Sequence, residues 1–177
     1  MSAAHLLVVG GRRSGKSRYA EEQALLSGLA PVYLATAEAG DAEMAARIAV
    51  HRQRRGDDWM TVEAPLEMPT VLSAAATSDR IVLVDCLTLW LANIMEAERD
   101  VESESEALVS ALDAAAGPVI LVSNEVGSGI VPVNALARRY ADAQGILNQK
   151  VAATVDRVVT MIAGIPLQLK PNQQANS

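Results

Sequence analysis

Aromatic side chains are scarce in this 177-residue sequence, which contains two Trp, three Tyr and no Phe. A core must therefore be built from aliphatic residues and Met, and the 50% share of hydrophobic residues argues against a disordered chain. Proteins that hold single-stranded nucleic acid stack its bases on aromatic rings, which this sequence largely lacks. The net charge of −6 gives no bulk attraction to nucleic acid or to anionic lipid either.

Cysteine and long apolar runs are also nearly absent. Cys86 is the one cysteine, which excludes a disulfide within the chain and argues against a cysteine-based zinc site. The most apolar segment, residues 81–95, contains Asp85 and Asn93 and is too short and too polar to span a bilayer. The first residues do not show the pattern of a signal peptide, so we expect a cytoplasmic protein with no membrane span.

Apolar runs of strand length alternate with longer stretches of helical spacing, and this pattern predicts an α/β fold. Because the strand candidates are continuous apolar runs, we expect a mostly parallel central sheet with helices on both faces. No linker is visible, so we expect one domain over residues 1–170 and a polar tail over residues 171–177. The expected strands are residues 5–9, 31–35, 60–64, 80–85, 118–123, 157–162 and 166–170, and the expected helices are residues 17–27, 41–55, 67–76, 88–97, 103–115 and 134–154.

A glycine-rich segment between the first expected strand and helix has the pattern G-x-x-x-x-G-K-[ST]. Glycine allows backbone angles that turn several N–H groups toward one point, and the following helix adds its positive end. Lys16 supplies a charge for the β- and γ-phosphates, and Ser17 supplies a hydroxyl for Mg²⁺. The segment therefore predicts a nucleoside triphosphate site, the alternative being a glycine turn that binds nothing. Its residues are Gly10, Gly11, Arg12, Arg13, Ser14, Gly15, Lys16 and Ser17.

Asp85 and His5 lie at the ends of two expected strands. Asp85 closes the apolar strand over residues 80–85, where a carboxylate near the phosphate loop can hold Mg²⁺ or a magnesium-bound water. An N-cap for the next helix is the alternative, and the two roles are compatible. His5 opens the first strand, and we interpret it as an edge or surface residue.

The second histidine lies among arginines. In the helix expected from residue 41, His51 has Arg47 four residues before it and Arg54 and Arg55 three and four residues after it. Positive charge disfavours the imidazolium form, so His51 is expected to be neutral and nucleophilic at pH 7. The guanidinium groups can hold phosphate oxygens. The neutral imidazole of His51 beside them is therefore suited to attack a nucleotide α-phosphorus. A partly buried helix histidine beside solvated arginines is the alternative.

With these residues in view, the sequence resembles the bifunctional adenosylcobinamide kinase/adenosylcobinamide-phosphate guanylyltransferase family from about residue 6 to residue 170. Three stretches carry the resemblance: GGRRSGKSRYAE at residues 10–21; YLATA at residues 33–37, continued by DAEMAARI at residues 41–48 and by His51 and Arg55; and SNEVGSGIVP at residues 123–132. The phosphate loop alone is generic, whereas the second and third stretches together are specific to this family.

The resemblance implies a role in adenosylcobalamin (vitamin B12) biosynthesis, in assembly of the nucleotide loop. It implies phosphorylation of adenosylcobinamide by ATP or GTP in the presence of Mg²⁺. GMP is then transferred from GTP to adenosylcobinamide phosphate through a GMP–histidine intermediate, which falls on His51. A phosphate-loop NTPase-like, RecA-like domain and a homotrimer are also implied. Besides the phosphate loop, the nucleotide contacts fall on Thr36, Ala37, Glu38, Arg52, Gln53, Arg54, Arg55, Glu63 and Asp85, and the metal ligands on Ser17 and Asp85.

Two other functions stay open at the level of sequence. The first is a simple phosphate-loop kinase for another small alcohol, without a covalent nucleotide on His51. The second is a nucleotide-dependent switch without transfer chemistry, which the nucleophile among arginines argues against. Residues 123–132 should lie at the carboxyl edge of the sheet, where they serve the corrinoid, a subunit interface or only the structure of a glycine-rich loop. Residues 87–117 match the family poorly, so nothing is transferred there.

Overall fold

The computed structural model describes residues 4–37, 56 and 58–170. Its strands form one sheet in the order β3-β2-β4-β5-β1-β6-β7. All neighbouring strands are parallel except β6 and β7, which form an antiparallel pair at the sheet border. The strands are β1 (Leu6–Gly10), β2 (Ala30–Ala35), β3 (Met60–Glu63), β4 (Arg80–Asp85), β5 (Val119–Val122), β6 (Arg157–Ile162) and β7 (Ile165–Lys170), and the helices are α1 (Lys16–Leu26), α3 (Met68–Ala75), α4 (Leu87–Glu96), α5 (Val101–Ala114) and α6 (Ala135–Thr154).

Each of these elements was expected from the sequence, and the helices lie on both faces of the sheet as predicted. The helix expected over residues 41–55 lies outside the described residues. Two caps explain where helices start: the side chains of Asp100 and Asn134 accept hydrogen bonds from Ser103 N and Ala137 N, respectively. Asp100 belongs to the acidic stretch EAERDVESESE at residues 96–106, which therefore contains the start of α5.

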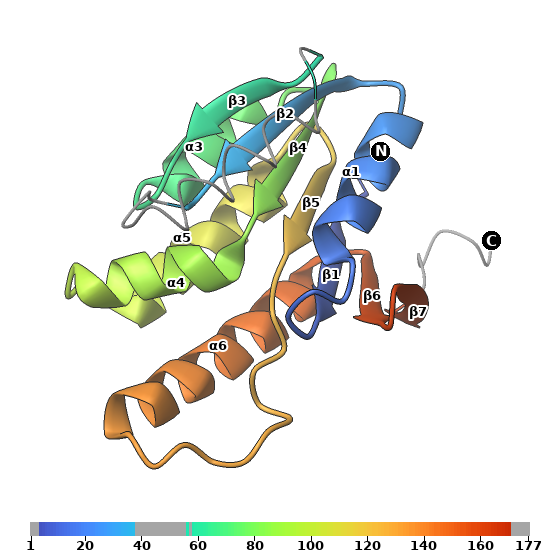
Figure 1. The fold of residues 1–177 in the computed structure, drawn as a ribbon. Helices are drawn as coiled ribbons and strands as arrows, with labels where there is room; N and C mark the ends of the chain where they lie inside the picture. Colours follow the sequence, from blue (N-terminus) through green and yellow to red (C-terminus); the bar gives the residue numbers. More distant parts are fainter. Residues whose placement is uncertain (1–3, 38–55, 57, 171–177) are drawn as a thin grey trace.

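Successive strand residues face opposite sides of the sheet, and each side packs against its own helices. Leu7 of β1 packs with Trp90 of α4 and Leu147 of α6 in one buried cluster. Its neighbours Leu6 and Val8 face the other way and pack in a second cluster with α1 residues. Helix α1 therefore covers one face alone in the described part, and α3, α4, α5 and α6 cover the other (Figure 1).

Residues 87–117, for which the resemblance implied nothing, build α4 and α5. Trp90 and Leu91 of α4 and Leu108 and Leu112 of α5 are fully buried against the sheet. This segment is therefore part of the main core. None of the described helices is long and apolar enough to cross a membrane.

The interpretation of His5 as an edge or surface residue is wrong. His5 is only 5% exposed, because its ring lies against Leu112 of α5 and Val119 of β5. Its Nδ1 accepts a hydrogen bond from Val119 N at 3.1 Å, and its Nε2 lies 3.1 Å from the carbonyl of Leu112. This pattern fits the neutral imidazole with its proton on Nε2. Burial lowers the pKa of His5 from its ordinary 6.5, and the carboxylates of Asp156 and Asp113 oppose this effect.

The folded protein should lose stability as His5 is forced to take a proton. Below pH 6.5 the unfolded chain binds a proton that folded His5 resists, so the free energy of unfolding falls as the pH falls. Denaturant unfolding between pH 7 and pH 5 measures this slope. A His5→Asn variant keeps an acceptor for Val119 N and has no titrating ring, so its slope should be shallower. Equal slopes in the two proteins would contradict this role of His5.

Candidate active site

The carboxyl ends of five strands bring the candidate residues to one edge of the sheet. Val8 of β1 is paired with Val122 of β5, Val122 with Asp85 of β4, Asp85 with Ala35 of β2, and Ala35 with Glu63 of β3. Neighbouring strands lie about 4.8 Å apart, so Asp85 is about 10 Å from β1 and Glu63 about 19 Å. Asp85 therefore belongs beside the phosphate loop, whereas Glu63 lies at the border strand, too far away to reach the same phosphates.

The phosphate loop joins β1 to α1 as the sequence predicted. Its backbone takes left-handed or strained angles at Gly10, Arg13 and Gly15, with φ of 151°, 58° and 97°. Gly15 is the N-cap of α1 and no side chain caps this helix, so the first N–H groups of α1 are open to an anion. The Oγ of Ser14 is buried and has no hydrogen-bond partner among the described residues. A phosphate oxygen would satisfy these donors, so the loop fits a nucleotide phosphate.

The turn between β6 and β7 supports the phosphate loop from one side. Gly164 N donates a hydrogen bond to the carbonyl of Ser14 at 3.1 Å, and its Cα lies 3.5 Å from the position that a side chain at Gly15 would take. A Cβ on Gly10 would lie 2.6 Å from the carbonyl oxygen of Met161 and 2.8 Å from Ser14 Oγ. Gly10 is therefore needed because β6 lies against the loop. The motif predicted the glycine but not this contact.

Lys16 is 7% exposed and lies inside the loop that it is expected to serve. Its Nζ donates a hydrogen bond to the carbonyl of Gly11 at 2.6 Å. Burial lowers the pKa of Lys16, while its interactions with the Cys86 and Asp85 side chains oppose this effect. The ammonium group is thus held in the loop near Asp85, where it can transfer from the carbonyl to a phosphate oxygen.

Asp85 and Ser17 are the expected donors for Mg²⁺, and both belong to the described residues. No group of three or more His, Cys, Asp or Glu side chains suited to a metal occurs in the described part of the chain. Two protein oxygens fit Mg²⁺, which usually keeps several waters and binds through one or two protein groups plus substrate phosphates. The alternative role of Asp85 as an N-cap is wrong, because Cys86 is the N-cap of α4.

Cys86 follows Asp85 and lies in the same buried region. Burial, with a smaller effect of the Asp85 charge, raises the pKa of its thiol to about 11. The thiol is therefore protonated at neutral pH and is a poor nucleophile. The peptide bond between Asp85 and Cys86 is cis.

Thr36 joins the ends of β2 and β4. Its hydroxyl donates to the carbonyl of Cys86 and accepts from the N–H of Cys86, both at 2.8 Å, and its side chain is fully buried. Asn93 of α4 donates to the carbonyl of Thr36 at 2.8 Å and to that of Pro65 at 3.1 Å. These bonds hold the end of β4, and with it Asp85, in position; the expected contact between Thr36 and a nucleotide stays a prediction. Ala37 follows it and is half-buried.

A polar network that the sequence analysis did not single out holds the end of β5. Gln144 and Asn148 of α6 bond to Ser123, and Asn148 Nδ2 also donates to the carbonyl of Asn124. Tyr140 OH lies 2.8 Å from the carbonyl of Thr88 and 3.2 Å from Gln144 Oε1. Tyr140, Gln144 and Asn148 are spaced by four residues, so a polar stripe on the expected helix was the available signal.

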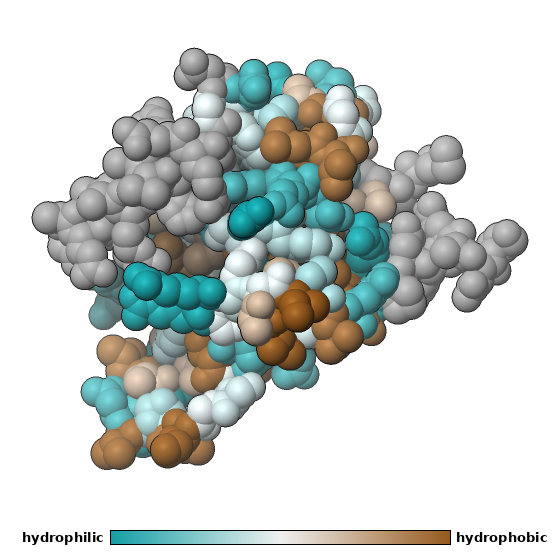
Figure 2. Space-filling model, turned by 45° about the vertical axis from the view of Figure 1, so that its right-hand side comes forward, coloured by the Kyte–Doolittle hydropathy of each residue, from teal (hydrophilic) through white to brown (hydrophobic). Residues whose placement is uncertain are grey.

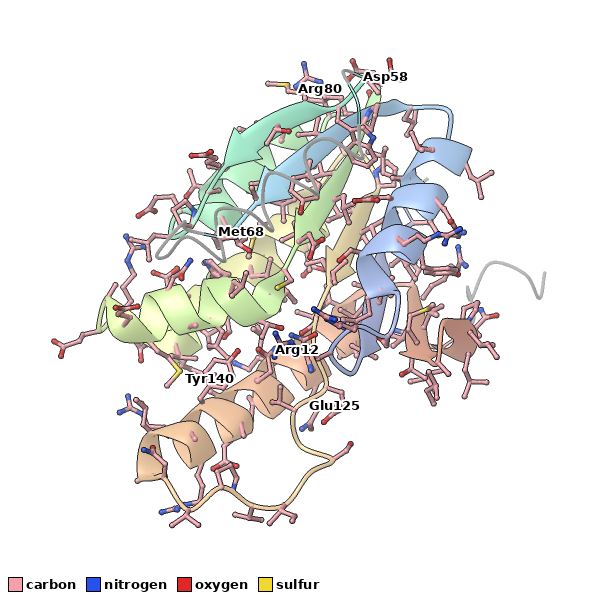
Figure 3. All side chains as sticks on the ribbon, viewed as in Figure 1. Arg12, Asp58, Met68, Arg80, Glu125 and Tyr140 are labelled. Carbon is pink, nitrogen blue, oxygen red and sulfur yellow. The ribbon has the colours of Figure 1, made fainter. Side chains whose placement is uncertain are left out.

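Several expected site residues lie outside the described residues. They are the nucleophile candidate and its flanking contacts, namely Glu38, His51, Arg52, Gln53, Arg54 and Arg55. The expected site residues that the structure describes are thus the phosphate loop, Thr36, Ala37, Glu63 and Asp85. In Figure 3, Arg12 of the loop and Glu125 after β5 lie at this edge, whereas Asp58 and Arg80 lie at the opposite edge of the sheet.

A side chain at Gly10 should damage the loop, whereas one at Gly11 should not. Gly10→Ala puts a methyl group against the Met161 carbonyl at a φ of 151°, and overpacking of this kind costs about 1–3 kcal/mol. We expect affinity for GTP with Mg²⁺ to fall at least ~10-fold in calorimetric titration. Gly11→Ala is the matched control, because nothing lies within 4 Å of its added Cβ. Equal affinities in the two variants would contradict the role of β6 in shaping the loop.

Solved structures with similar folds agree with the expected RecA-like architecture. The chain aligns with the RadB recombinase with a TM-score of 0.53 at 18% identity, over 89% of this chain and 73% of that one. It aligns with the flagellar accessory protein FlaH from Methanocaldococcus jannaschii with a TM-score of 0.51 at 11% identity, over 98% of this chain and 81% of that one. At these identities the likenesses show the fold alone, and they confirm the expected fold class.

Sequence comparisons identify the family. The bifunctional adenosylcobalamin biosynthesis protein CobP of Pseudomonas aeruginosa is 49% identical over 93% of this chain and 96% of its own length. The bifunctional adenosylcobalamin biosynthesis protein CobU of Salmonella typhimurium is 38% identical over 93% of this chain and 99% of its own length. The family model described as cobinamide kinase/cobinamide phosphate guanyltransferase matches residues 6–169. The chain therefore belongs to the cobinamide kinase/cobinamide phosphate guanyltransferase family, as the resemblance of its motifs implied.

Proposed function

We propose that this chain catalyses two successive steps of adenosylcobalamin biosynthesis. It phosphorylates adenosylcobinamide with ATP or GTP, and it transfers GMP from GTP to adenosylcobinamide phosphate to give adenosylcobinamide-GDP and pyrophosphate. The observation that carries the proposal is a phosphate loop with Lys16 enclosed beside Asp85, in a chain that matches the family model from residue 6 to residue 169. A simple phosphate-loop kinase is not favoured, because the family description includes both activities.

In the phosphorylation step, the phosphate loop holds the β- and γ-phosphates. The open N–H groups of α1, the hydroxyl of Ser14 and the ammonium of Lys16 face the place where charge builds up on the transferring group. Ser17 and Asp85 would hold Mg²⁺, which would neutralise charge on the β- and γ-phosphates. Arg12 and Arg13 add positive charge at the rim of the loop.

In the guanylyl transfer step, we assign the nucleophile to His51. Its neutral imidazole attacks the α-phosphorus of GTP, the bond to the bridging oxygen breaks, and pyrophosphate leaves. The phosphate of the second substrate then displaces the histidine, so the chain returns to its starting state. Arg52, Gln53, Arg54 and Arg55 would hold the phosphates, and Ala37, Glu38 and Glu63 would lie toward the ribose and base. This assignment comes from the sequence pattern and the resemblance, since residues 38–55 lie outside the described residues.

We further propose a single catalytic domain over residues 1–170, a cytoplasmic location and a homotrimer. Large apolar side chains on the loop after β5 and at the start of α6 support a contact between subunits: Ile130 and Val133 are each 98% exposed, and Leu136 is 65% exposed. Brown patches mark the lower end of the molecule in Figure 2, where α6 begins in Figure 1.

Two variants should separate the two reactions. His51→Ala should lower GMP transfer at least ~1000-fold, because the nucleophile is lost, and should leave phosphorylation of adenosylcobinamide within about threefold. Lys16→Ala should lower phosphorylation at least ~100-fold. Product formation in each half-reaction, followed by chromatography of the corrinoids, measures both. Lys150→Ala, on α6, is the control for loss of a lysine. GMP transfer at the normal rate in His51→Ala would contradict the covalent step.

A further inference from the structure

Glu125 follows β5, the strand between β1 and β4, and the nucleotide contacts proposed above do not include it. Strand β5 is the neighbour of both β1 and β4, so the segment after β5 emerges between their carboxyl ends. Ser123 N donates to the carbonyl of Val8 at 2.9 Å, and Glu125 N donates to the carbonyl of Gly10 at 3.0 Å. The backbone of Glu125 is thus bonded to the residue at which the phosphate loop begins.

The carboxylate of Glu125 is held on one oxygen and open on the other. Its Oε1 accepts a hydrogen bond from Gly127 N at 2.6 Å, and a Cβ at Gly127 would crowd this oxygen at 3.1 Å. The residue is exposed, and no lysine or arginine in the described part of the chain forms an ion pair with it. A fixed carboxylate with a free oxygen at the rim of a phosphate site is able to accept a proton.

The two other acidic residues that the structure describes at this edge are less suited to that task. Asp85 is near enough to the Lys16 ammonium to oppose the lowering of its pKa by burial, so this carboxylate already serves the ammonium group and the proposed metal site. Glu63 is four strands from β1, about 19 Å away by strand spacing. Glu125 alone, among these three, follows the strand that is adjacent to β1 and is not assigned to charge neutralisation.

We propose that Glu125 is the general base of the phosphorylation step, an inference that rests on the kinase half of the proposed function. The substrate hydroxyl oxygen forms a bond to the γ-phosphorus, and the bond from the γ-phosphorus to the bridging oxygen breaks. The hydroxyl proton passes to the carboxylate of Glu125, and the nucleoside diphosphate leaves with the bridging electrons. Lys16 stabilises the charge on this leaving group.

The test is Glu125→Gln, which keeps the shape of the side chain and an oxygen for Gly127 N but removes the base. We expect kcat for phosphorylation of adenosylcobinamide by ATP to fall at least ~100-fold, with KM for ATP within about twofold. The rise of kcat with pH that reports a base should disappear from the profile. GMP transfer to adenosylcobinamide phosphate should stay within about threefold, because no hydroxyl is deprotonated there. Glu106→Gln, an exposed residue of α5, is the matched control.

The outcomes separate this inference from the proposed function. The role of Glu125 alone would be overturned if the wild-type protein phosphorylates adenosylcobinamide and the kcat of Glu125→Gln is within threefold of the wild-type kcat. An equal fall in both half-reactions, or a large rise in KM for ATP, would show a structural role and would also overturn it. Wild-type protein that transfers GMP and does not phosphorylate adenosylcobinamide would overturn the kinase half itself, and this inference with it.

Discussion

The close packing of Gly10 against the Met161 carbonyl is the contact on which the rest of the site depends. It brings β6 against the start of the phosphate loop, where only a glycine fits at this φ. The bond from Gly164 N to the Ser14 carbonyl fixes the far side of the same loop. Lys16 is enclosed because the loop is held in this shape, and the open N–H groups of α1 converge for the same reason.

The strand order decides which residues meet the loop. Strand β5 lies between β1 and β4, so Asp85 is two strands from the phosphate loop. The residues after β5 therefore emerge between the carboxyl ends of β1 and β4. Thr36 ties the end of β2 to Cys86, and the network of Gln144 and Asn148 ties the end of β5 to α6. These bonds to buried partners fix the carboxyl edge from both sides, which is how a site built on short loops keeps its geometry.

Sequence reasoning was strongest where the signal is local. The phosphate loop, the central strand that ends at Asp85 and the helix that begins near Asn134 follow from short patterns, and the structure has each of them where expected. It failed where distant segments meet. His5 is buried because Leu112 and Val119 cover it, and no local pattern predicted the bonds between Thr36 and Cys86. Neither pairing leaves a periodic trace in the chain.

The assignment of both kinase and guanylyltransferase activities came from the family resemblance, not from local sequence patterns. Spacing alone allowed His51 to be an ordinary helix residue, and the phosphate loop names neither base nor acceptor. The second and third motif stretches carried the resemblance, and the family match over residues 6–169 agrees with it. The contacts of the structure add what the family name does not contain. They show how β5 and β6 shape the phosphate loop, and they place Glu125 where it can act as a base for the substrate hydroxyl.

The most direct measurement of the central claim is the mass of the protein after reaction with GTP. Wild-type protein is incubated with Mg²⁺ and GTP labelled at the α-phosphate, denatured, digested and analysed by mass spectrometry. The account predicts one GMP bound to the peptide that contains His51, lost in acid and stable in alkali, and absent when the label is on the γ-phosphate. Folded protein that binds GTP and carries no GMP on His51 would contradict the covalent mechanism.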